Sequence, residues 1–315
     1  MKGYVLKFDE LKRFLVKDAE NYGCKVLCGD SVESALIENE KIRGVILENS
    51  KVSIKGKIIV DASGPSGVIA SKIGLRKKVL CTPSEGLEYI MTGVSFPQKN
   101  VLSFYLGKKF APDGYAWIFP MGPNLAKAGV AVYDASKYLK GRHIIDILKN
   151  FVSQVSWLNS AKPVELHGGS IYIKGGIKNY VFSNVLSIGD SGSQINPLGG
   201  EGIRHAMRAG RMASESIDKV LKTGVNSYLL EYQKEWKKYV ALKWKISQFL
   251  TQIIYHKLND KLIDKGLFLL QSLTPNDVSD IFFEYQFQKF LKVIKPKHFS
   301  PFLIMETLRL QFAKS

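Results

Sequence analysis

The chain has 315 residues and carries 45 lysine and arginine residues against 28 aspartate and glutamate residues, a formal net charge of +17. Hydrophobic residues make up 45% and charged residues 23%, which is typical of a folded chain and excludes an intrinsically disordered one. No stretch approaches the ~18 uncharged apolar residues of a membrane span, and no apolar segment follows Met1 as in a signal peptide. The sequence therefore predicts a cytoplasmic protein that meets a membrane, if at all, at its periphery.

The positive charge would attract an anionic membrane surface, an anionic substrate or nucleic acid, although a lysine-rich solvated surface explains it equally well. The lysines are spread along the chain without a helix-turn-helix, zinc-finger or RNP motif, so we predict no nucleic-acid partner. Cys24, Cys28 and Cys81 form one C-x-x-x-C pair and a single cysteine. Without a second pair or a histidine cluster, they predict no metal site and a reducing compartment.

The N-terminal region is predicted to form a helix followed by short strands. Asp9 can cap a helix from Glu10 to about Tyr22, and Gly23 can end it. The continuous apolar run before Asp61 is typical of a strand buried on both faces in a parallel sheet. The strands of this region are expected at 25–28 leading into 32–37, at 42–47, at 52–54 and at 57–61.

The middle of the chain is rich in strand patterns and predicts an antiparallel sheet inserted into an α/β frame. Its elements are strands at 89–96, 101–106, 115–119, 126–133 and 168–173, with helices at 135–139 and 144–154. A second buried strand at 185–190 leads into a helix near 202–221. The face that we expect this helix to bury consists of Ile203, Ala206, Met207, Gly210, Ala213, Ile217 and Val220. From about 226 the chain is predicted to be helical, interrupted at Pro275, Pro296 and Pro301.

The segment after the second buried strand carries the strongest chemical signal. Gly189-Asp190 places a carboxylate at the carboxyl edge of the sheet, where open α/β folds bind ligands and where it can accept hydrogen bonds from polyol hydroxyls. The glycines that follow let backbone N–H groups approach a flat ligand at a helix N-terminus. A glycine-rich turn capped by Asp190 is the alternative. The residues that favour a flavin site over that turn are Pro197, Gly199, Gly200, Gly202 and Ile203.

Two further segments support this interpretation. Asp61-Ala62-Ser63-Gly64 also follows a buried strand and would bring backbone close to a phosphate-bearing ligand, although many strand ends look similar. The alternating aromatic segment Tyr115-x-Trp117-x-Phe119-Pro120 suits an apolar substrate chain, because it supplies contact area and excludes water. The alternative is that these aromatic residues form one face of a packed sheet.

The chain resembles the geranylgeranyl reductase family of flavoproteins in the order of four segments. These are Phe8-Asp9 with its helix, 60–64, 114–120 and 189–203. Within this family, the chain is most similar to the digeranylgeranylglycerophospholipid reductases. The resemblance covers nearly the whole chain and is specific at the last two motifs. It implies the two-dinucleotide-binding flavoprotein fold of p-hydroxybenzoate hydroxylase and an enzyme that saturates isoprenoid double bonds with reduced FAD.

The resemblance also implies roles for particular residues. Asp190 would contact the FAD ribityl chain, and Gly202 and Ile203 would offer their backbone to the isoalloxazine ring. The other cofactor-binding positions that it implies are Val32, Asp61, Gly64, Gly189, Pro197, Gly199 and Gly200. The family's substrate signature matches Tyr115, Trp117, Phe119 and Pro120 and continues to a Gly-x-Gly, of which this chain keeps only Gly129. The implied domains are a partial FAD-binding domain at 1–80 and 180–224, a substrate-binding sheet at 81–179 and a helical region at 225–315.

One family feature is not matched. The family opens with a βαβ unit of about 30 residues or more that carries G-x-G-x-x-G, whereas only Met1–Lys7 precede Phe8-Asp9 and no G-x-G-x-x-G occurs in the chain. We therefore expect a fragment or truncated form, a separate chain that supplies the βαβ unit, or a protein that has lost FAD.

Three functions stay open: a flavin-dependent isoprenoid reductase, a flavin monooxygenase or halogenase of the same fold, and a non-catalytic lipid-binding remnant. In the first, reduced flavin would transfer a hydride to one alkene carbon and a proton would add to the other, after reduction of the flavin by NADPH, ferredoxin or another donor. The proton donor is unknown, and we expect His205 to be a core residue rather than that donor. The implied substrate is an isoprenoid membrane lipid. Lysines with Trp236, Trp244 and Phe249 could dock the helical region on an anionic membrane.

Overall fold

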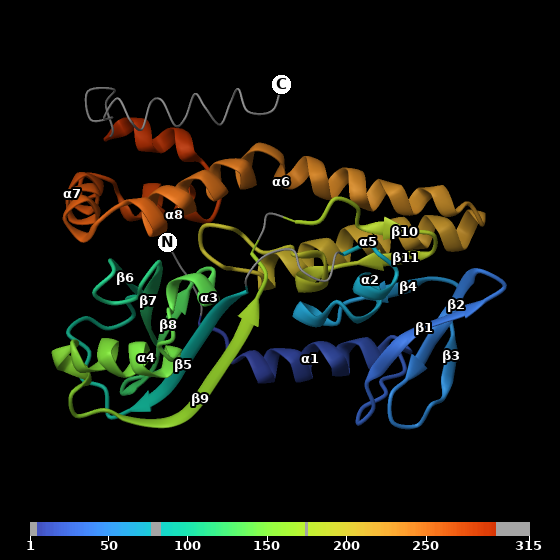
Figure 1. Cartoon of the computed structure of the whole chain (residues 1–315), viewed down its shortest axis with the longest axis horizontal. Helices are drawn as coiled ribbons and strands as arrows, with labels where there is room; N and C mark the ends of the chain where they lie inside the picture. Colours follow the sequence, from blue (N-terminus) through green and yellow to red (C-terminus); the bar gives the residue numbers. More distant parts are fainter. Residues whose placement is uncertain (1–4, 77–82, 174–175, 294–315) are drawn as a thin grey trace. The chain divides into compact units, whose positions relative to one another are not determined.

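The computed structural model describes residues 5–76, 83–173 and 176–293 (Figure 1). Cys81, Pro296 and Pro301 lie outside these ranges. The chain divides into two compact units, one of residues Val5–Lys257 and one that contains Met1–Tyr4 and Leu258–Ser315. The first unit contains both strand systems that the sequence predicts.

The N-terminal helix α1 (Phe8–Asn21) begins earlier than predicted. Lys7 is its N-cap residue and provides no side-chain cap. Asp9 lies in the first turn, where its carboxylate is 2.6 Å from the Lys12 ammonium group, so its predicted capping role is wrong. No strand forms at 25–28. The strands after it form an antiparallel sheet in chain order: β1 (Val32–Glu38), β2 (Lys41–Leu47) and β3 (Ser53–Lys55).

A second small sheet contains the two strands whose ends carry Asp61 and Asp190. Its order is β10 (Val181–Phe182), β11 (Val185–Ser187) and β4 (Ile59–Asp61). β11 and β4 are parallel, with Ser187 opposite Asp61. Ile59 is buried beside helix α2 (Val68–Lys72), whereas Val60 is 40% exposed. Because successive side chains of a strand point to opposite faces, only one face of β4 is buried, and the predicted burial of both faces is wrong.

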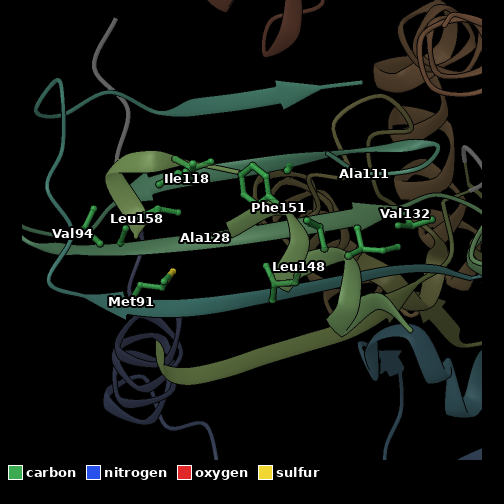
Figure 2. Packing of buried hydrophobic residues seen from close by; sticks show 14 residues of the cluster. Met91, Val94, Ala111, Ile118, Ala128, Val132, Leu148, Phe151 and Leu158 are labelled. Carbon is green, nitrogen blue, oxygen red and sulfur yellow. The ribbon is translucent and has the colours of Figure 1, made fainter. Parts of the chain in front are cut away.

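The inserted antiparallel sheet is present as predicted. Its strands, in spatial order, are β6 (Ser103–Leu106), β7 (Gly114–Pro120), β8 (Leu125–Val132), β5 (Ser84–Thr92) and β9 (Lys162–Ile171). One face packs against helix α4 (Ile144–Ser153). Phe151 and Leu148 of this helix meet Ile118, Ala128 and Met91 of the sheet (Figure 2). The short helix α3 (Ala135–Tyr138) and the 3₁₀ turn Ser156–Leu158 flank α4.

Helix α5 (Ile203–Thr223) buries Ala213 and Val220 as predicted, but its buried face is turned away from Ile203 and Met207. Its buried residues are His205, Ala209, Ala213, Ser216 and Val220, whereas Ile203 and Met207 are 42% and 55% exposed. The His205 ring lies 5.5 Å from the Trp244 ring and 6.2 Å from the Trp236 ring, both on helix α6 (Leu229–Thr251). The apolar pattern misplaced the face because aromatic rings of α6, which lies beside α5 in Figure 1, accommodate an imidazole.

The C-terminal helices also correct one prediction. Trp236 and Trp244 are 0% and 2% exposed and Phe249 is partly buried, so these side chains belong to the interior and do not form a membrane-docking cluster. α6 continues into a π-helix at Gln252–Lys257. The second unit contains α7 (Asp260–Leu270), α8 (Pro275–Phe282) and the 3₁₀ turn Phe287–Lys292. Among the described residues, no helix is both long and apolar enough to cross a membrane.

Candidate functional site

The carboxyl ends of β4 and β11 meet at one edge of the parallel pair, and hydrogen bonds tie their loops together. The Asp61 carbonyl accepts hydrogen bonds from the Ser191 hydroxyl at 2.6 Å and from the Ile188 N–H at 3.0 Å. The two predicted cofactor segments, Asp61–Gly64 and Gly189–Asp190, are therefore neighbours. Gly64 begins a 3₁₀ turn with φ +68°, and Gly189 begins another with φ +64°.

The Asp61 carboxylate stabilises the fold locally. One oxygen accepts hydrogen bonds from the Ser63 N–H and hydroxyl, and the other from the N–H groups of Ile69 and Ala70 in α2, at distances from 2.6 to 3.0 Å. The residue is 3% exposed. Both oxygens are occupied, so Asp61 can contribute to a ligand site through the loop that it shapes rather than through its carboxylate.

Asp190 has different surroundings. It is half-buried in the turn Gly189–Gly192, and burial raises the pKa of its carboxyl, although the positive charge of Arg76 opposes this shift. The backbone of Gly202 lies close to this carboxylate, because a Cβ atom at Gly202 would be 3.2 Å from Asp190 Oδ1. The carboxylate therefore lies beside the N-terminus of α5, which begins directly after Gly202.

Arg76 is a buried charged residue whose effect on Asp190 the sequence did not predict. This residue is 4% exposed, and its guanidinium carbon lies 4.7 Å from the centre of the Tyr172 ring. Arg76 follows a short helix in a lysine-rich run, where nothing in the sequence distinguishes it from solvated neighbours. Its electrostatic effect on Asp190 makes it a second charged group at this site.

The loop from β11 to α5 is mostly buried and is fixed by hydrogen bonds, but one of its residues is exposed to solvent. The residues 191–198 are buried, whereas Gly199 is exposed. The Gln194 side chain accepts the Gly189 N–H at 2.7 Å and donates to the Tyr232 hydroxyl at 2.9 Å. At the helix N-terminus, hydrogen bonds from His205 and Arg204 to Glu201 outweigh the effect of burial and lower its pKa to about 2. Pro197 is therefore in the buried part of the loop, and Gly199 is where it reaches the surface.

A hydrogen bond joins this loop to the aromatic strand. The Tyr115 hydroxyl donates to the Gly199 carbonyl at 2.7 Å, and a Cβ atom on Gly200 would lie 3.6 Å from the same hydroxyl. Two segments far apart in the sequence, the Tyr-x-Trp-x-Phe strand and the Gly-Gly-Glu-Gly loop, are thus in direct contact.

The aromatic residues of β7 lie on the sheet face opposite α4. Ala116 and Ile118 are fully buried on the α4 side, while Tyr115, Trp117 and Phe119 are partly exposed on the other. Their ring centres follow one another at 5.6 and 6.2 Å. This face, which we call the aromatic face, is not the packed core of the sheet. Pro120 ends the strand at its far end from the loop.

Gly129 lies directly under Trp117. A Cβ atom at Gly129 would be 2.3 Å from Trp117 Cζ2, so the ring can rest on the sheet only because this position is glycine. The indole N–H donates to Glu88 at 3.2 Å, and Glu88 also pairs with Lys127 at 2.9 Å. Sequence reasoning found Gly129 but missed Glu88 and Lys127, whose role depends on strand register.

The remaining predicted residues have simpler positions. Val32 packs against the small core around Ile42 and Ile59, away from the aromatic face. His205 is 0% exposed and lies 3.3 Å from Glu201, which confirms that it is a core residue. Within residues 5–76, 83–173 and 176–293, no group of three or more His, Cys, Asp or Glu residues could hold a metal ion.

Comparison with solved structures defines the class of fold. A geranylgeranyl bacteriochlorophyll reductase-like protein from Thermoplasma acidophilum superimposes with a TM-score of 0.86 over 98% of this chain and 76% of that chain, at 21% identity. A flavin-dependent brominase superimposes with a TM-score of 0.63 over 89% of this chain and 75% of that one, at 18% identity. The fold is therefore the mixed α/β fold of flavin-dependent enzymes, as predicted.

Comparison of sequences gives the family. The pattern described as the geranylgeranyl reductase catalytic domain matches residues 84–171. Digeranylgeranylglycerophospholipid reductases from Methanococcus aeolicus and Methanocaldococcus jannaschii are each 30% identical to the chain. The alignments cover 89% and 94% of this chain and 70% and 74% of those proteins. The chain belongs to the geranylgeranyl reductase family and is an oxidoreductase of the flavin-dependent kind.

Proposed function

We propose that this protein binds FAD at the loop between β11 and α5 and reduces geranylgeranyl double bonds of a membrane lipid or its precursor on the aromatic face. The observation that carries the proposal is the Tyr115–Gly199 hydrogen bond, 2.7 Å long, which joins the predicted flavin loop to the predicted substrate strand. A reaction between a flavin and an apolar chain needs both surfaces at one place.

The residues at the loop fit a flavin. Gly199 is exposed, and a Cβ atom added there would meet nothing closer than Asn196 Nδ2 at 4.0 Å, so a flat ring can approach the backbone. The first N–H groups of α5 have no intrahelical acceptor and attract negative charge. Asp190 is near enough to this helix end to accept hydrogen bonds from ribityl hydroxyls. FAD, when bound, supplies the hydride; the chain positions both reactants and excludes water.

The aromatic face fits an isoprenoid chain. Tyr115, Trp117 and Phe119 form a continuous apolar strip, and Phe104 of the neighbouring strand extends it, with its ring centre 5.2 Å from that of Phe119. The strip has no nucleophile that could attack the substrate, and it contributes contact area and dryness. We also propose NADPH, ferredoxin or another donor as the source of electrons; dithionite replaces it in the assays below.

The flavin site is tested with a matched pair of glycine variants. Gly199→Ala adds a methyl group into the space that the ring would occupy, without meeting protein atoms closer than 4.0 Å. Gly210→Ala adds the same group on α5, where nothing lies within 4 Å. We expect the wild type and Gly210→Ala to retain flavin absorption after desalting with FAD, and Gly199→Ala to lose most of it. Equal retention in all three would contradict the site.

This assay also tests a separate partner. The alternative to FAD binding by this chain alone is a G-x-G-x-x-G βαβ unit on a second chain, which would hold the FAD pyrophosphate. Retention of FAD by this chain alone would show that no such partner is required.

The substrate site is tested with Trp117→Ala and, as control, Tyr22→Ala, which removes an aromatic ring that is 87% exposed. With FAD, dithionite and a digeranylgeranyl phospholipid, mass spectrometry should detect added hydrogen pairs. We expect Trp117→Ala to raise KM for the lipid about tenfold, since covering a partly exposed aromatic ring with the lipid contributes roughly 1.5–3 kcal/mol, while FAD retention stays unchanged. Halide-dependent halogenation or oxygenation of an aromatic substrate, without alkene reduction, would instead favour the halogenase or monooxygenase alternative.

We further propose that the protein meets anionic membranes through α7. This helix exposes Phe268 (72%), Leu262 and Leu267 and carries Lys261 and Lys265. Exposed apolar side chains beside lysines are typical of helices that bind anionic lipid surfaces. Flotation with phosphatidylglycerol vesicles should recover the wild type and Tyr22→Ser but less of Phe268→Ser. Equal recovery with phosphatidylcholine vesicles, or none with either, would contradict this proposal.

A further inference from the structure

Three consecutive carbonyl groups of the loop accept hydrogen bonds from side-chain hydroxyls. Thr251 donates to the Pro197 carbonyl at 2.8 Å, a bond shared with a carbonyl of its own helix. Tyr133 and Tyr255 both donate to the Leu198 carbonyl, at 2.8 and 3.0 Å. Tyr115 donates to the Gly199 carbonyl at 2.7 Å. We call these four residues the hydroxyl clamp.

The clamp comes from separate parts of the fold. Tyr115 and Tyr133 lie on or next to the substrate sheet, whereas Tyr255 lies in the π-helix that follows α6. The Tyr133 and Tyr255 rings stack at 4.8 Å with an angle of 16° between their planes, which fixes both hydroxyls. π-Helical turns are rare and occur frequently at functional sites. This one directs the Tyr255 hydroxyl onto the loop.

These tyrosines act as donors at any physiological pH. Burial raises the pKa of the Tyr133 and Tyr255 hydroxyls well above the ordinary value, and burial also raises that of Tyr115. A phenol that stays protonated keeps its hydrogen available for a carbonyl oxygen.

The carbonyl pattern determines where the N–H groups point. In a trans peptide, the N–H points away from the C=O of the same unit. The Leu198 N–H donates to the Asn196 side chain at 2.8 Å, and the Gly200 N–H donates to the Asn196 backbone carbonyl at 2.9 Å. Among the described residues, the Gly199 N–H has no acceptor. It belongs to the peptide whose carbonyl accepts two tyrosine hydroxyls.

Two hydrogen bonds on a carbonyl polarise its peptide and strengthen the N–H on the other side. A fixed, polarised N–H at an exposed glycine stabilises negative charge on a ligand, as donors of an oxyanion hole do. Fully reduced flavin is more anionic than oxidised flavin, and it carries that charge on its pyrimidine ring. The clamp therefore favours the reduced form if a flavin ring lies at Gly199.

We infer that Tyr133 and Tyr255 are positioning residues that act through the Leu198–Gly199 peptide to bind anionic reduced flavin more tightly than oxidised flavin. This inference rests on the proposed function and deepens it, because it assigns the tuning of the cofactor to side chains of the substrate sheet and the π-helix.

The test uses Tyr133→Phe/Tyr255→Phe, which removes both hydroxyls from the Leu198 carbonyl and keeps both rings. The control is Tyr105→Phe, whose ring packs on Phe110 and Phe151 in the sheet core. We expect the double variant to bind reduced FAD about tenfold more weakly relative to oxidised FAD, which lowers the two-electron midpoint potential by about 30 mV. Tyr105→Phe should keep the wild-type potential.

Several outcomes separate this inference from the proposed function. If the wild type binds no FAD in either redox state, the proposed function fails. If it binds FAD and the double variant keeps the wild-type potential, the inference is wrong and the proposed function stands. If the double variant does not fold, the test uses Tyr255→Phe alone, which keeps the Tyr133 hydrogen bond. This variant should lower the midpoint potential by a smaller amount. An unchanged potential would overturn the inference. Hydrogen exchange at the Gly199 amide of the FAD-free protein should also change in the double variant but not in Tyr105→Phe.

Discussion

The parallel strands β4 and β11 lie side by side and both lead into a carboxylate among small residues, yet the two carboxylates have different surroundings. Asp61 is the last residue of its strand, is 3% exposed and accepts four hydrogen bonds from its own chain. Asp190 lies beyond the end of β11, in a 3₁₀ turn beside α5, and is half-buried with a raised pKa due to burial. Similar sequences at neighbouring strand ends thus produce a structural acid and an acid that we propose as part of the cofactor site.

The difference arises from the segment that comes after each acid. Helix α2 begins close enough to Asp61 for the N–H groups of Ile69 and Ala70 to reach its carboxylate. After Asp190 the chain makes a longer buried loop before α5 begins at Ile203. A strand-end carboxylate serves the fold when the next helix supplies its donors, and it is available to a ligand when a loop intervenes.

The largest effect expected from this comparison concerns stability. Asp61→Ala should lower the free energy of unfolding by about 2–4 kcal/mol, because it removes a buried acceptor and leaves helix N–H groups unpaired. Asp190→Ala should lower it by less than about 1 kcal/mol, as expected for a partly exposed residue. Urea unfolding of both variants measures this. Equal losses would show that the two acids play the same structural role.

The second effect concerns cofactor binding. Asp190→Asn keeps the size of the side chain but removes its charge, and a hydrogen bond to a charged group contributes about 1.5–3 kcal/mol, which corresponds to roughly 10- to 100-fold in affinity. We expect a loss of FAD affinity in that range by fluorescence titration. Asp218→Asn, an exposed α5 acid paired with Lys222, is the matched control. A variant that binds FAD like the wild type would remove Asp190 from the site.

The sequence predicted much of this architecture because strands have strong patterns. The apolar runs before Asp61 and Asp190 are typical of strands in a parallel pair, and the alternating segments predicted the antiparallel sheet with errors of up to six residues at the strand ends. The sequence could not predict that both carboxylate oxygens of Asp61 accept hydrogen bonds from the chain. The reason is that α2, which supplies two of the donors, has only five residues and is too short for a periodic signal.

Contacts between distant segments were also beyond the sequence. The bonds from Tyr115 to Gly199 and from Trp117 to Glu88 depend on strand register and loop path, which local patterns do not specify. The effect of Arg76 on Asp190 depends on the same kind of tertiary placement. The α5 face was misjudged for a related reason, since the rule that apolar residues are buried favoured Met207 over His205.

A pair of glycines sharpens the comparison further. Gly64, after β4, has φ +68° with open space around it, so Gly64→Ala should cost about 1–2 kcal/mol of stability through backbone strain alone. Gly202 has φ −123°, which alanine adopts freely, but a Cβ there would lie 3.2 Å from Asp190 Oδ1. Gly202→Ala should therefore keep the unfolding midpoint and weaken FAD binding, by less than Asp190→Asn does. The opposite assignment, a stable Gly64→Ala and an unstable Gly202→Ala, would contradict this difference between the two strand ends.

The smallest effect is a pair of opposed pH dependences at Asp190. Burial raises the pKa of its carboxyl in the folded, FAD-free protein above the ordinary aspartate value of about 3.9. In the pH window between these two pKa values, the folded state holds a proton that the unfolded state has lost. As the pH rises through this window, the wild type should lose stability relative to Asp190→Asn. FAD hydroxyls that donate to the carboxylate favour its charged form, and the FAD affinity of the wild type should therefore increase over the same window. Asp190→Asn should show neither slope, and a variant that keeps both would assign the titration to another group.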